Sequence, residues 1–307
     1  MSCIPNLFVI GAPKCGTTAL VEALSRHPEI YVPKKEIRYF DARTFYDFPE
    51  DAQVRTLDQY LRYFDSNSAA RSRYRVDGSV FNMYAASSLQ DILALNANAK
   101  FVLTLRDPLD AAKSMHMQRL KYHDLRMREV SESFADCWKL LDERRVGRGF
   151  PPGCRNRFLF RYDLLYDYGL YLPHIEQLVP ARNLALIDYA DLVRRPGETL
   201  EALWRFLGVE RHPISMSREN NSYVVEPNFL SKLSERFVRR SAPLRHALAA
   251  AGLPINRIGR AMISKRSAPP AQSRASDVDA IASAEFSGSA AAMADTLSKY
   301  SVMKWAT

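Results

Sequence analysis

The fold is decided near the start of the chain, which reads Leu7-Phe8-Val9-Ile10-Gly11-Ala12-Pro13-Lys14-Cys15-Gly16-Thr17-Thr18. Its first four residues form a short apolar run, which is typical of a strand buried in a parallel sheet. Residues 11–16 predict a turn, and Thr17 begins a helix that ends at His27-Pro28. The N–H groups and the dipole of a helix start favour an anion in such a turn. The sequence therefore predicts a phosphate-binding loop.

The lysine of this loop does not stand where ATP- and GTP-binding loops have it. A Walker A loop has lysine directly after its second glycine, whereas here Thr17 follows Gly16 and the lysine is Lys14. No clear Walker B carboxylate follows an apolar strand. Two alternatives remain open from the residues alone, namely an ATP-dependent kinase and a turn that binds no ligand.

A second unit of the same kind begins at residue 100. Residues 101–105 predict a strand, Arg106-Asp107-Pro108 a turn, and Leu109 onward a helix, in which proline suits the first turn. Arg106 offers a planar fork of donors to a phosphate, and Ser114 adds a hydroxyl two turns along the helix. We interpret this pair as a second anion site, the alternative being a surface ion pair of Arg106.

Further elements alternate along the chain. Strands are predicted at Arg157–Tyr162 and Asn183–Asp188, and helices at Tyr171–Val179 and Thr199–Leu207. Alternation of this kind predicts an α/β fold in three layers, with a central, mostly parallel β-sheet flanked by helices.

The two anion sites together resemble those of sulfotransferases that use PAPS (3′-phosphoadenosine 5′-phosphosulfate). Residues 13–20 look like the 5′-phosphosulfate loop, and Arg106 with Ser114 is similar to the 3′-phosphate site. Residues 35–41, Lys-Glu-Ile-Arg-Tyr-Phe-Asp, resemble the Lys-Glu-x-x-Phe-Phe segment of carbohydrate sulfotransferases such as the heparan sulfate group, and residues 75–79 resemble the strand and turn that follow. The resemblance runs from about residue 5 to residue 210 and implies a P-loop-like fold in a soluble member of bacterial type.

The resemblance also implies a reaction. PAPS would be the co-substrate and adenosine 3′,5′-bisphosphate the product, without a metal, and the acceptor would be a hydroxyl, less readily an amine, of a carbohydrate or glycolipid. Lys14 would stabilise the leaving group, and Glu36 would be the base. The implied nucleotide-binding residues are Lys14, Cys15, Gly16, Thr17, Thr18, Arg106 and Ser114. The implied acceptor-binding residues are Arg38, Asp41 and Asp77.

Some residues depart from the family pattern. Related 3-O-sulfotransferases have histidine where this chain has Arg38, and lysine where Gly78 follows Asp77. The acceptor therefore need not be heparan sulfate. Glu36 also has a simpler interpretation, a surface glutamate in a charged run. A protein that kept the fold as a non-catalytic anion- or membrane-surface-binding protein is a further alternative.

Cys15 and two histidines are further candidates for chemistry. Cys15 lies beside Lys14 at a helix start, a position that favours the thiolate, although we interpret it as a tolerated loop residue. His116 and His123 are seven residues apart without nearby carboxylate or cysteine partners, so no metal is expected.

Composition and charge limit the partners. The chain has 307 residues, 47% of them hydrophobic, and a net charge of +9. No apolar run reaches the ~20 residues of a membrane span, the first residues do not predict a secretory leader, and the four cysteines form no CxxC pair. A cytoplasmic location is predicted, with peripheral membrane association as the alternative.

Most of the charge falls in one segment. Residues 232–266 contain nine Lys or Arg and a single acidic residue, Glu235, so their net charge is +8 and the rest of the chain carries about +1. Residues 229–266 are interpreted as a basic amphipathic helix on an anionic membrane or an acidic glycan, or equally as a helix packed on the domain. No nucleic-acid partner is expected, and the oligomeric state is not indicated.

Three regions are predicted along the chain. Residues 5–266 would form the sulfotransferase domain. Residues 267–295, of which 16 of 29 are Ala or Ser, would be a connector with flexible parts. Residues 296–307, with Leu297, Tyr300, Met303 and Trp305, would dock back onto the domain.

Overall fold

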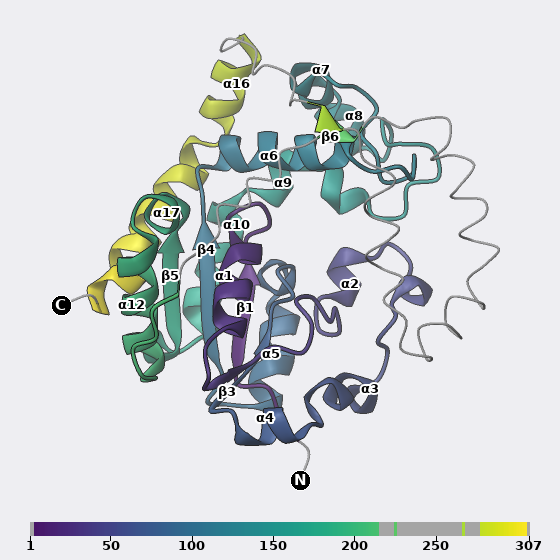
Figure 1. The fold of residues 1–307 in the computed structure, drawn as a ribbon. Coiled ribbons are helices and arrows are strands. Elements are labelled where there is room, and N and C mark those ends of the chain that lie inside the picture. The colour runs from purple at the N-terminus through teal and green to yellow at the C-terminus, as the bar shows by residue number, and fades with distance from the viewer. Residues whose placement is uncertain (1–2, 215–223, 226–265, 268–276, 306–307) are drawn as a thin grey trace.

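A parallel five-stranded sheet forms the centre of the protein (Figure 1). The computed structural model describes residues 3–214, 224–225, 266–267 and 277–305. The strand order is β2-β3-β1-β4-β5, and every pairing in this sheet is parallel. The strands are β1 Leu7–Gly11, β2 Ile30–Tyr31, β3 Tyr74–Asp77, β4 Lys100–Leu105 and β5 Leu184–Asp188. The predicted α/β fold and three of the four predicted strands are confirmed.

Both faces of the sheet are buried. Phe8 and Ile10 of β1 pack into one hydrophobic cluster, whereas Leu7 and Val9 of the same strand pack into another. The strands β4 and β5 divide their residues between the two clusters in the same alternating way. Side chains of a strand point to opposite faces in turn, so a continuous apolar run fits a sheet covered on both sides.

Helices form the two outer layers (Figure 1). The cluster on one face includes residues of α1 Thr17–Ser25 and α12 Pro196–Leu207. The other face is covered by α5 Ala86–Leu95, α6 Pro108–Leu120 and α10 Tyr168–Leu178. The predicted helices that begin at Thr17 and Leu109, and those predicted at 171–179 and 199–207, are thereby confirmed.

Shorter elements complete the described chain. The short α-helices are α2 Ala42–Phe45, α3 Leu57–Leu61, α4 Asn67–Arg71, α7 Phe134–Lys139, α8 Leu141–Arg145, α9 Tyr162–Leu165 and α11 Tyr189–Arg194. A separate antiparallel pair joins β6 Val224–Val225 to β7 Arg266–Ser267.

The strand predicted at residues 157–162 is wrong. Arg157–Phe160 form a 3-10 helix, and α9 follows it. The backbone here is anchored by side chains, because Arg144 donates to the Phe160 carbonyl at 2.9 Å and Asp47 accepts from the Arg157 N–H at 3.2 Å. A short apolar run does not by itself distinguish a strand from a buried helical turn.

The Ala/Ser-rich segment is largely helical. Within the predicted connector 267–295 the structure has α16 Asp277–Glu285 and the start of α17 Ser287–Tyr300, which suits alanine as the best helix former. The α17 helix packs on α10 and β5, and Thr296 donates to Glu176 at 2.6 Å. Residues 268–276 of the connector lie outside the described residues.

The C-terminal residues lie against the edge of the sheet. Ser301 pairs with Leu186 of β5 in a parallel bridge, and Val302 is fully buried. Arg205 of α12 donates to the Trp305 carbonyl at 3.0 Å. This end of the chain therefore contacts the body of the protein.

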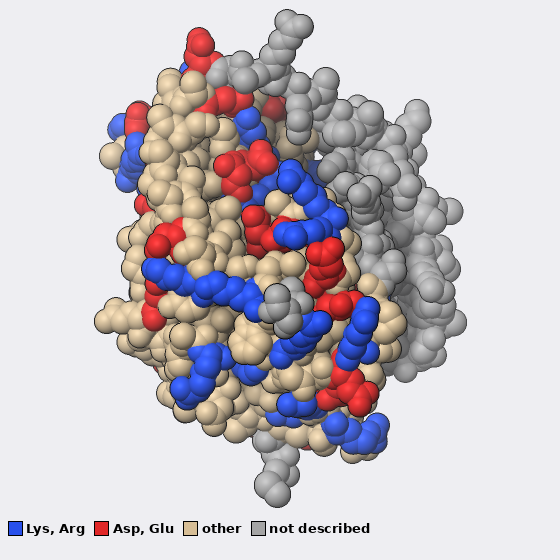
Figure 2. Space-filling view, turned by 90° about the vertical axis from the view of Figure 1, so that its left-hand side faces the viewer, with Lys and Arg blue, Asp and Glu red and all other residues tan. Residues whose placement is uncertain are grey.

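Charges of both signs are interspersed on the face formed by α12 and α17 (Figure 2). Ion pairs there include Arg195–Asp191 at 2.5 Å and Lys299–Glu176 at 3.2 Å. The basic segment predicted at 229–266 lies outside the described residues, except for Arg266. Among the described helices, none is both long and apolar enough to cross a bilayer.

Candidate active site

The loop after β1 is fixed to the neighbouring strand β4. The Ala12 N–H donates to the Thr104 carbonyl at 2.7 Å, and the Thr104 hydroxyl donates to the Gly11 carbonyl at 3.1 Å. A Cβ at Gly11 would lie 2.2 Å from Sδ of Met83, so a side chain there would displace Met83. The loop therefore begins at a position set by the sheet itself.

The inner side of the loop rests on buried tyrosines. The Tyr166 hydroxyl donates to the Pro13 carbonyl at 3.2 Å, and the Tyr168 hydroxyl lies 3.7 Å from Sγ of Cys15. Cys15 is fully buried, and its N–H donates to the Ala12 carbonyl at 3.3 Å. Burial raises the pKa of its thiol to about 12, which outweighs the lowering by Arg106 and Lys14. Cys15 holds the loop together from inside.

The outer side of the loop presents donors. Lys14 and Gly16 both have left-handed backbone, with φ of 67° and 84°, and a Cβ on Gly16 would come within 2.9 Å of Leu192. No side chain caps the start of α1, so the N–H groups of its first turn are left for a ligand. Thr17 is buried and Thr18 is exposed. This is the geometry of an anion cradle.

Lys14 lies among other cations. Burial, followed by repulsion from Lys121, Lys35 and Arg119, lowers the pKa of its ammonium group to about 8. A bound anion would offset both effects. Arg119 and Lys121 were missed from the sequence, although Lys121 stands two helical turns after Ser114, a spacing that places both on one face of α6.

The second predicted anion site lies where β4 ends. Arg106 stacks on the ring of Tyr189 at 4.7 Å and pairs with Asp110 at 3.3 Å, while its Nε is buried without a hydrogen-bond partner. Ser114 is half-buried on α6. Because β1 and β4 are adjacent parallel strands, the two predicted sites lie at the same edge of the sheet.

A buried hydrogen-bond network positions the segment that contains Glu36. The Ser79 hydroxyl accepts from the N–H groups of Ile37 at 3.1 Å and Arg38 at 3.0 Å, and donates to Asp77 at 2.6 Å. Asp77 also accepts from the Tyr60 hydroxyl at 2.8 Å and is fully buried. Asp77 was expected to bind the acceptor. It instead holds the backbone of residues 37 and 38 in place through Ser79.

Gly78 accounts for a departure from the family pattern. A Cβ at this position would lie 2.5 Å from the carbonyl oxygen of Lys35. A lysine, as the resemblance would have here, does not fit this backbone, because the close approach of residues 35 and 78 requires glycine.

Glu36 is held between two cations. Lys35 lies 3.0 Å from one carboxylate oxygen, and Arg38 pairs with the other. The Arg38 guanidinium stacks on Phe45 at 3.5 Å and lies 3.5 Å from Asp41. Glu36 is therefore not a free surface glutamate. The guanidinium of Arg38 is engaged by Glu36 and Asp41.

Asp41 is enclosed behind this pair. Its side chain is fully buried, and Oδ1 has no hydrogen-bond partner. Burial outweighs the attraction of Arg38 and raises the pKa of the carboxyl to about 7. The predicted acceptor-binding residues Arg38, Asp41 and Asp77 are thus brought together with Glu36, but the two aspartates support it rather than face open space.

His116 has a structural role. It is buried, and its Nε2 lies 3.1 Å from the Ser131 carbonyl. Across the described ranges, no three His, Cys, Asp or Glu side chains are grouped to hold a metal.

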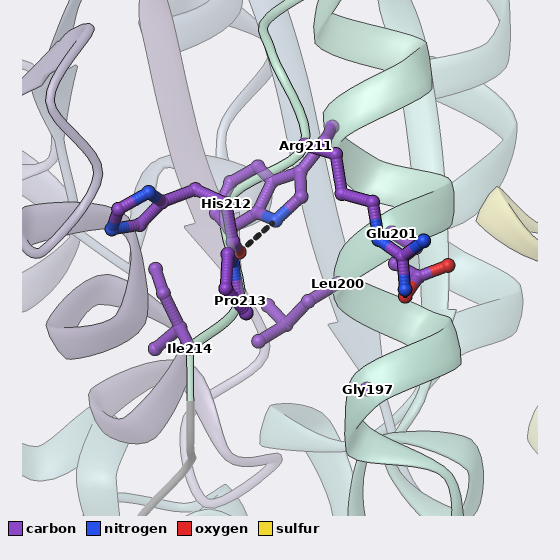
Figure 3. Close-up of a pocket in the computed structure, with 8 residues that line it drawn as sticks. Gly197, Leu200, Glu201, Arg211, His212, Pro213 and Ile214 are labelled. Carbon is purple, nitrogen blue, oxygen red and sulfur yellow. Dashed lines mark hydrogen bonds and ion pairs between the residues drawn. The ribbon is translucent and has the colours of Figure 1, made fainter.

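A pocket of about 380 Å³ lies elsewhere, between α12 and residues 211–214 (Figure 3). Trp204 donates to the His212 carbonyl at 3.1 Å beside it, and Arg211 pairs with Glu201 at its rim. None of the predicted site residues lines this pocket.

Comparison with known proteins gives consistent matches. The family model described as "Sulfotransferase domain" matches residues 5–234. Bifunctional heparan sulfate N-deacetylase/N-sulfotransferase 4 of Mus musculus is 25% identical over 218 residues, 68% of this chain and 23% of the relative. The corresponding protein 3 of Homo sapiens is 26% identical over 212 residues, with the same two shares. This chain spans about a quarter of the length of these relatives.

A solved structure is also similar. The crystal structure of a sulfotransferase from Alicyclobacillus acidocaldarius superposes with a TM-score of 0.59 at 27% identity, covering 71% of this chain and 87% of that one. The likeness extends over most of both chains.

The Ser79 network can be tested by its effect on two amides. Ser79→Ala should destabilise the protein by about 1–3 kcal/mol, because it leaves the buried N–H groups of Ile37 and Arg38 without their acceptor. Urea unfolding measures the loss, and hydrogen exchange should show faster exchange at these two amides. Ser88→Ala is the control, since Ser88 is as buried but bonds to Phe40. Unchanged exchange at residues 37 and 38 in Ser79→Ala would contradict this role.

Proposed function

This chain belongs to the sulfotransferase-domain family, and on that premise we propose that it transfers the sulfuryl group of PAPS to a hydroxyl, less readily an amine, of a carbohydrate or glycolipid. One observation carries the proposal. Two sites with unsatisfied cationic or N–H donors follow the adjacent strands β1 and β4 at one edge of the sheet, and a nucleotide with a 5′- and a 3′-phosphate would occupy both.

The residues present fit PAPS. The first turn of α1 and Lys14 would hold the 5′-phosphosulfate, since helix N–H groups and a cation are what that group requires. Arg106 would hold the 3′-phosphate through donors that include its unpartnered Nε, with Ser114 beside it. When bound, PAPS supplies a sulfuryl group attached to a phosphate that leaves readily.

Lys14 acts on the charge of the leaving group. Its ammonium group extends from a loop that the sheet and two tyrosines hold rigid, so no reorganisation is needed as negative charge develops on the phosphate. The repulsion from neighbouring cations makes this lysine favour an anionic partner more strongly than an isolated one would.

Glu36 serves as the base toward the acceptor. A hydroxyl group has to lose its proton as the new S–O bond forms, and a carboxylate within hydrogen-bond reach can take it. Arg38 fixes the orientation of this carboxylate, and the Asp77–Ser79 network fixes the segment that carries it. Sulfuryl transfer resembles phosphoryl transfer in depending mainly on such alignment.

The acceptor class is inferred from two sources. The Lys-Glu-x-x-Phe-Phe resemblance and the heparan sulfate relatives favour a carbohydrate. Arg38 and Gly78 argue against the acceptor of the 3-O-sulfotransferases. The cytoplasmic location expected from cysteine usage stays a prediction.

Nucleotide selectivity tests the donor. Adenosine 3′,5′-bisphosphate should raise the melting temperature of the protein and ATP with Mg²⁺ should not, because a lysine at position 14 and a 3′-phosphate site suit the former. Arg106→Ala should weaken binding of the bisphosphate about 10- to 100-fold by calorimetry. Arg62→Ala, an exposed arginine paired with Asp58, is the control. Stabilisation by ATP alone would favour a kinase and overturn the proposal.

Transfer of label from radiolabelled PAPS tests the base. On any acceptor found by screening sugars and glycolipids, Glu36→Gln should lower kcat about 100-fold or more with nucleotide affinity unchanged, since glutamine keeps the shape but does not accept the proton. Glu22→Gln, at an exposed glutamate of α1, should behave like the wild type. Wild-type turnover in Glu36→Gln would remove Glu36 as the base.

A further inference from the structure

Arg119 is a buried cation without a counter-ion in the described chain. It lies on the core side of α6, in register with Ala112 and Met115, and its side chain is 3% exposed. Its Nε and Nη1 are buried and donate no hydrogen bond. The guanidinium stacks on the Tyr122 ring at 4.1 Å, a contact through its face that does not satisfy the in-plane donors Nε and Nη1.

The same protein treats another buried arginine differently. Arg144 is 2% exposed, and its guanidinium is saturated by both oxygens of Glu129 and by the carbonyls of Phe160 and Gly149. Buried polar groups in native proteins are almost always paired in this way, because an unpaired buried charge is strongly destabilising. Arg119 therefore requires a partner that the described residues do not supply.

The position of Arg119 separates it from the predicted 3′-phosphate site. Arg106 precedes the first turn of α6 and Arg119 lies in its last turn, so their Cα atoms are about 18 Å apart along the helix axis. Arg106 stacks on Tyr189 beyond β5, whereas Arg119 stacks on Tyr122 past the other end of the helix. The two arginines therefore start from opposite ends of α6 and stack on different tyrosines.

Arg119 instead belongs with the cations around Lys14. It is one of the three side chains whose charge lowers the pKa of Lys14, together with Lys121 and Lys35. Lys35 has a carboxylate partner in Glu36. The surroundings of Lys14 thus combine positive charge with two buried guanidinium nitrogens that have no hydrogen-bond partner.

We propose that Arg119 is the centre of a second anion-binding subsite beside Lys14, which takes a sulfate-, phosphate- or carboxylate-type oxyanion. The inference rests on the proposed function for the source of that oxyanion. It is either the sulfuryl group of the donor or an anionic substituent of the acceptor. The planar guanidinium suits both, because it offers parallel N–H donors to two oxygens of one group.

The subsite itself is tested with inorganic sulfate. The protein is saturated with adenosine 3′,5′-bisphosphate, which occupies the nucleotide sites but has no sulfuryl group, and sodium sulfate is then titrated against sodium chloride of equal ionic strength. Arg119→Gln should bind sulfate about 10- to 100-fold more weakly than the wild type by calorimetry. Arg119→Lys should keep part of the affinity, and Arg126→Gln, at an exposed arginine paired with Asp124, should keep all of it.

Two further arms identify the source. If the sulfuryl group of the donor is the ligand, Arg119→Gln weakens binding of PAPS but not of adenosine 3′,5′-bisphosphate. If the acceptor supplies the anion, both nucleotides bind as before, and KM rises for a uronic acid acceptor but not for the neutral sugar of the same structure. Equal sulfate affinity in Arg119→Gln and the wild type would overturn the subsite.

Stability separates this role from a structural one. Arg119→Met should raise the melting temperature of the ligand-free protein, because it removes a buried unpaired charge. A lower melting temperature with sulfate binding intact would assign Arg119 to packing against Tyr122. Failure of the wild type to bind adenosine 3′,5′-bisphosphate would refute the proposed function. In that case the sulfate affinities of the wild type and Arg119→Gln, compared without nucleotide, would still test the subsite.

Discussion

The arrangement of the whole site depends on the parallel pairing of β1 with β4. This pairing fixes the start of the Lys14 loop through the Thr104 hydrogen bonds and places the Arg106 turn at the same edge of the sheet. Ligands of open α/β sheets bind outside the carboxyl ends of the strands. A cation cluster can persist there because the sheet, buried on both faces, holds the loop regardless of the repulsion between its charges.

Several buried polar and charged groups of the site lower the stability of the folded protein, and the core around them holds them in place. The Nε atoms of Arg106 and Arg119 and one oxygen of Asp41 are buried without partners, and Lys14 lies among like charges. Native proteins carry few unpartnered buried groups, and groups with a strongly shifted pKa cluster at functional sites. By contrast, the buried polar groups of the Arg144–Glu129 pair and of the Asp77–Ser79 network have hydrogen-bond partners.

Sequence patterns predicted the elements that depend on local rules. The loop at 11–18, the strands of β1, β4 and β5 and the helix starts at Thr17 and Pro108 follow from apolar runs, glycine and proline. The strand expected at 157–162 is wrong because the Arg144 and Asp47 side chains, from other segments, bond the backbone of Phe160 and Arg157. Asp77 supports the Glu36 segment and Arg119 lacks a counter-ion because both are buried by distant parts of the chain. The spacing of residues in the sequence does not predict such burial.

The central claim is that Lys14 sits in a site built for an anion, and titration of its ammonium group tests this most directly. NMR of isotope-labelled lysine side chains, assigned with Lys14→Arg, should give a pKa of about 8 in the free protein and a higher pKa with adenosine 3′,5′-bisphosphate bound. Above about pH 6, where the phosphates of the nucleotide are fully ionised, affinity should then fall as pH rises through 8, because the free lysine loses its proton there. An ordinary lysine pKa near 10.5 that the nucleotide leaves unchanged would contradict the account.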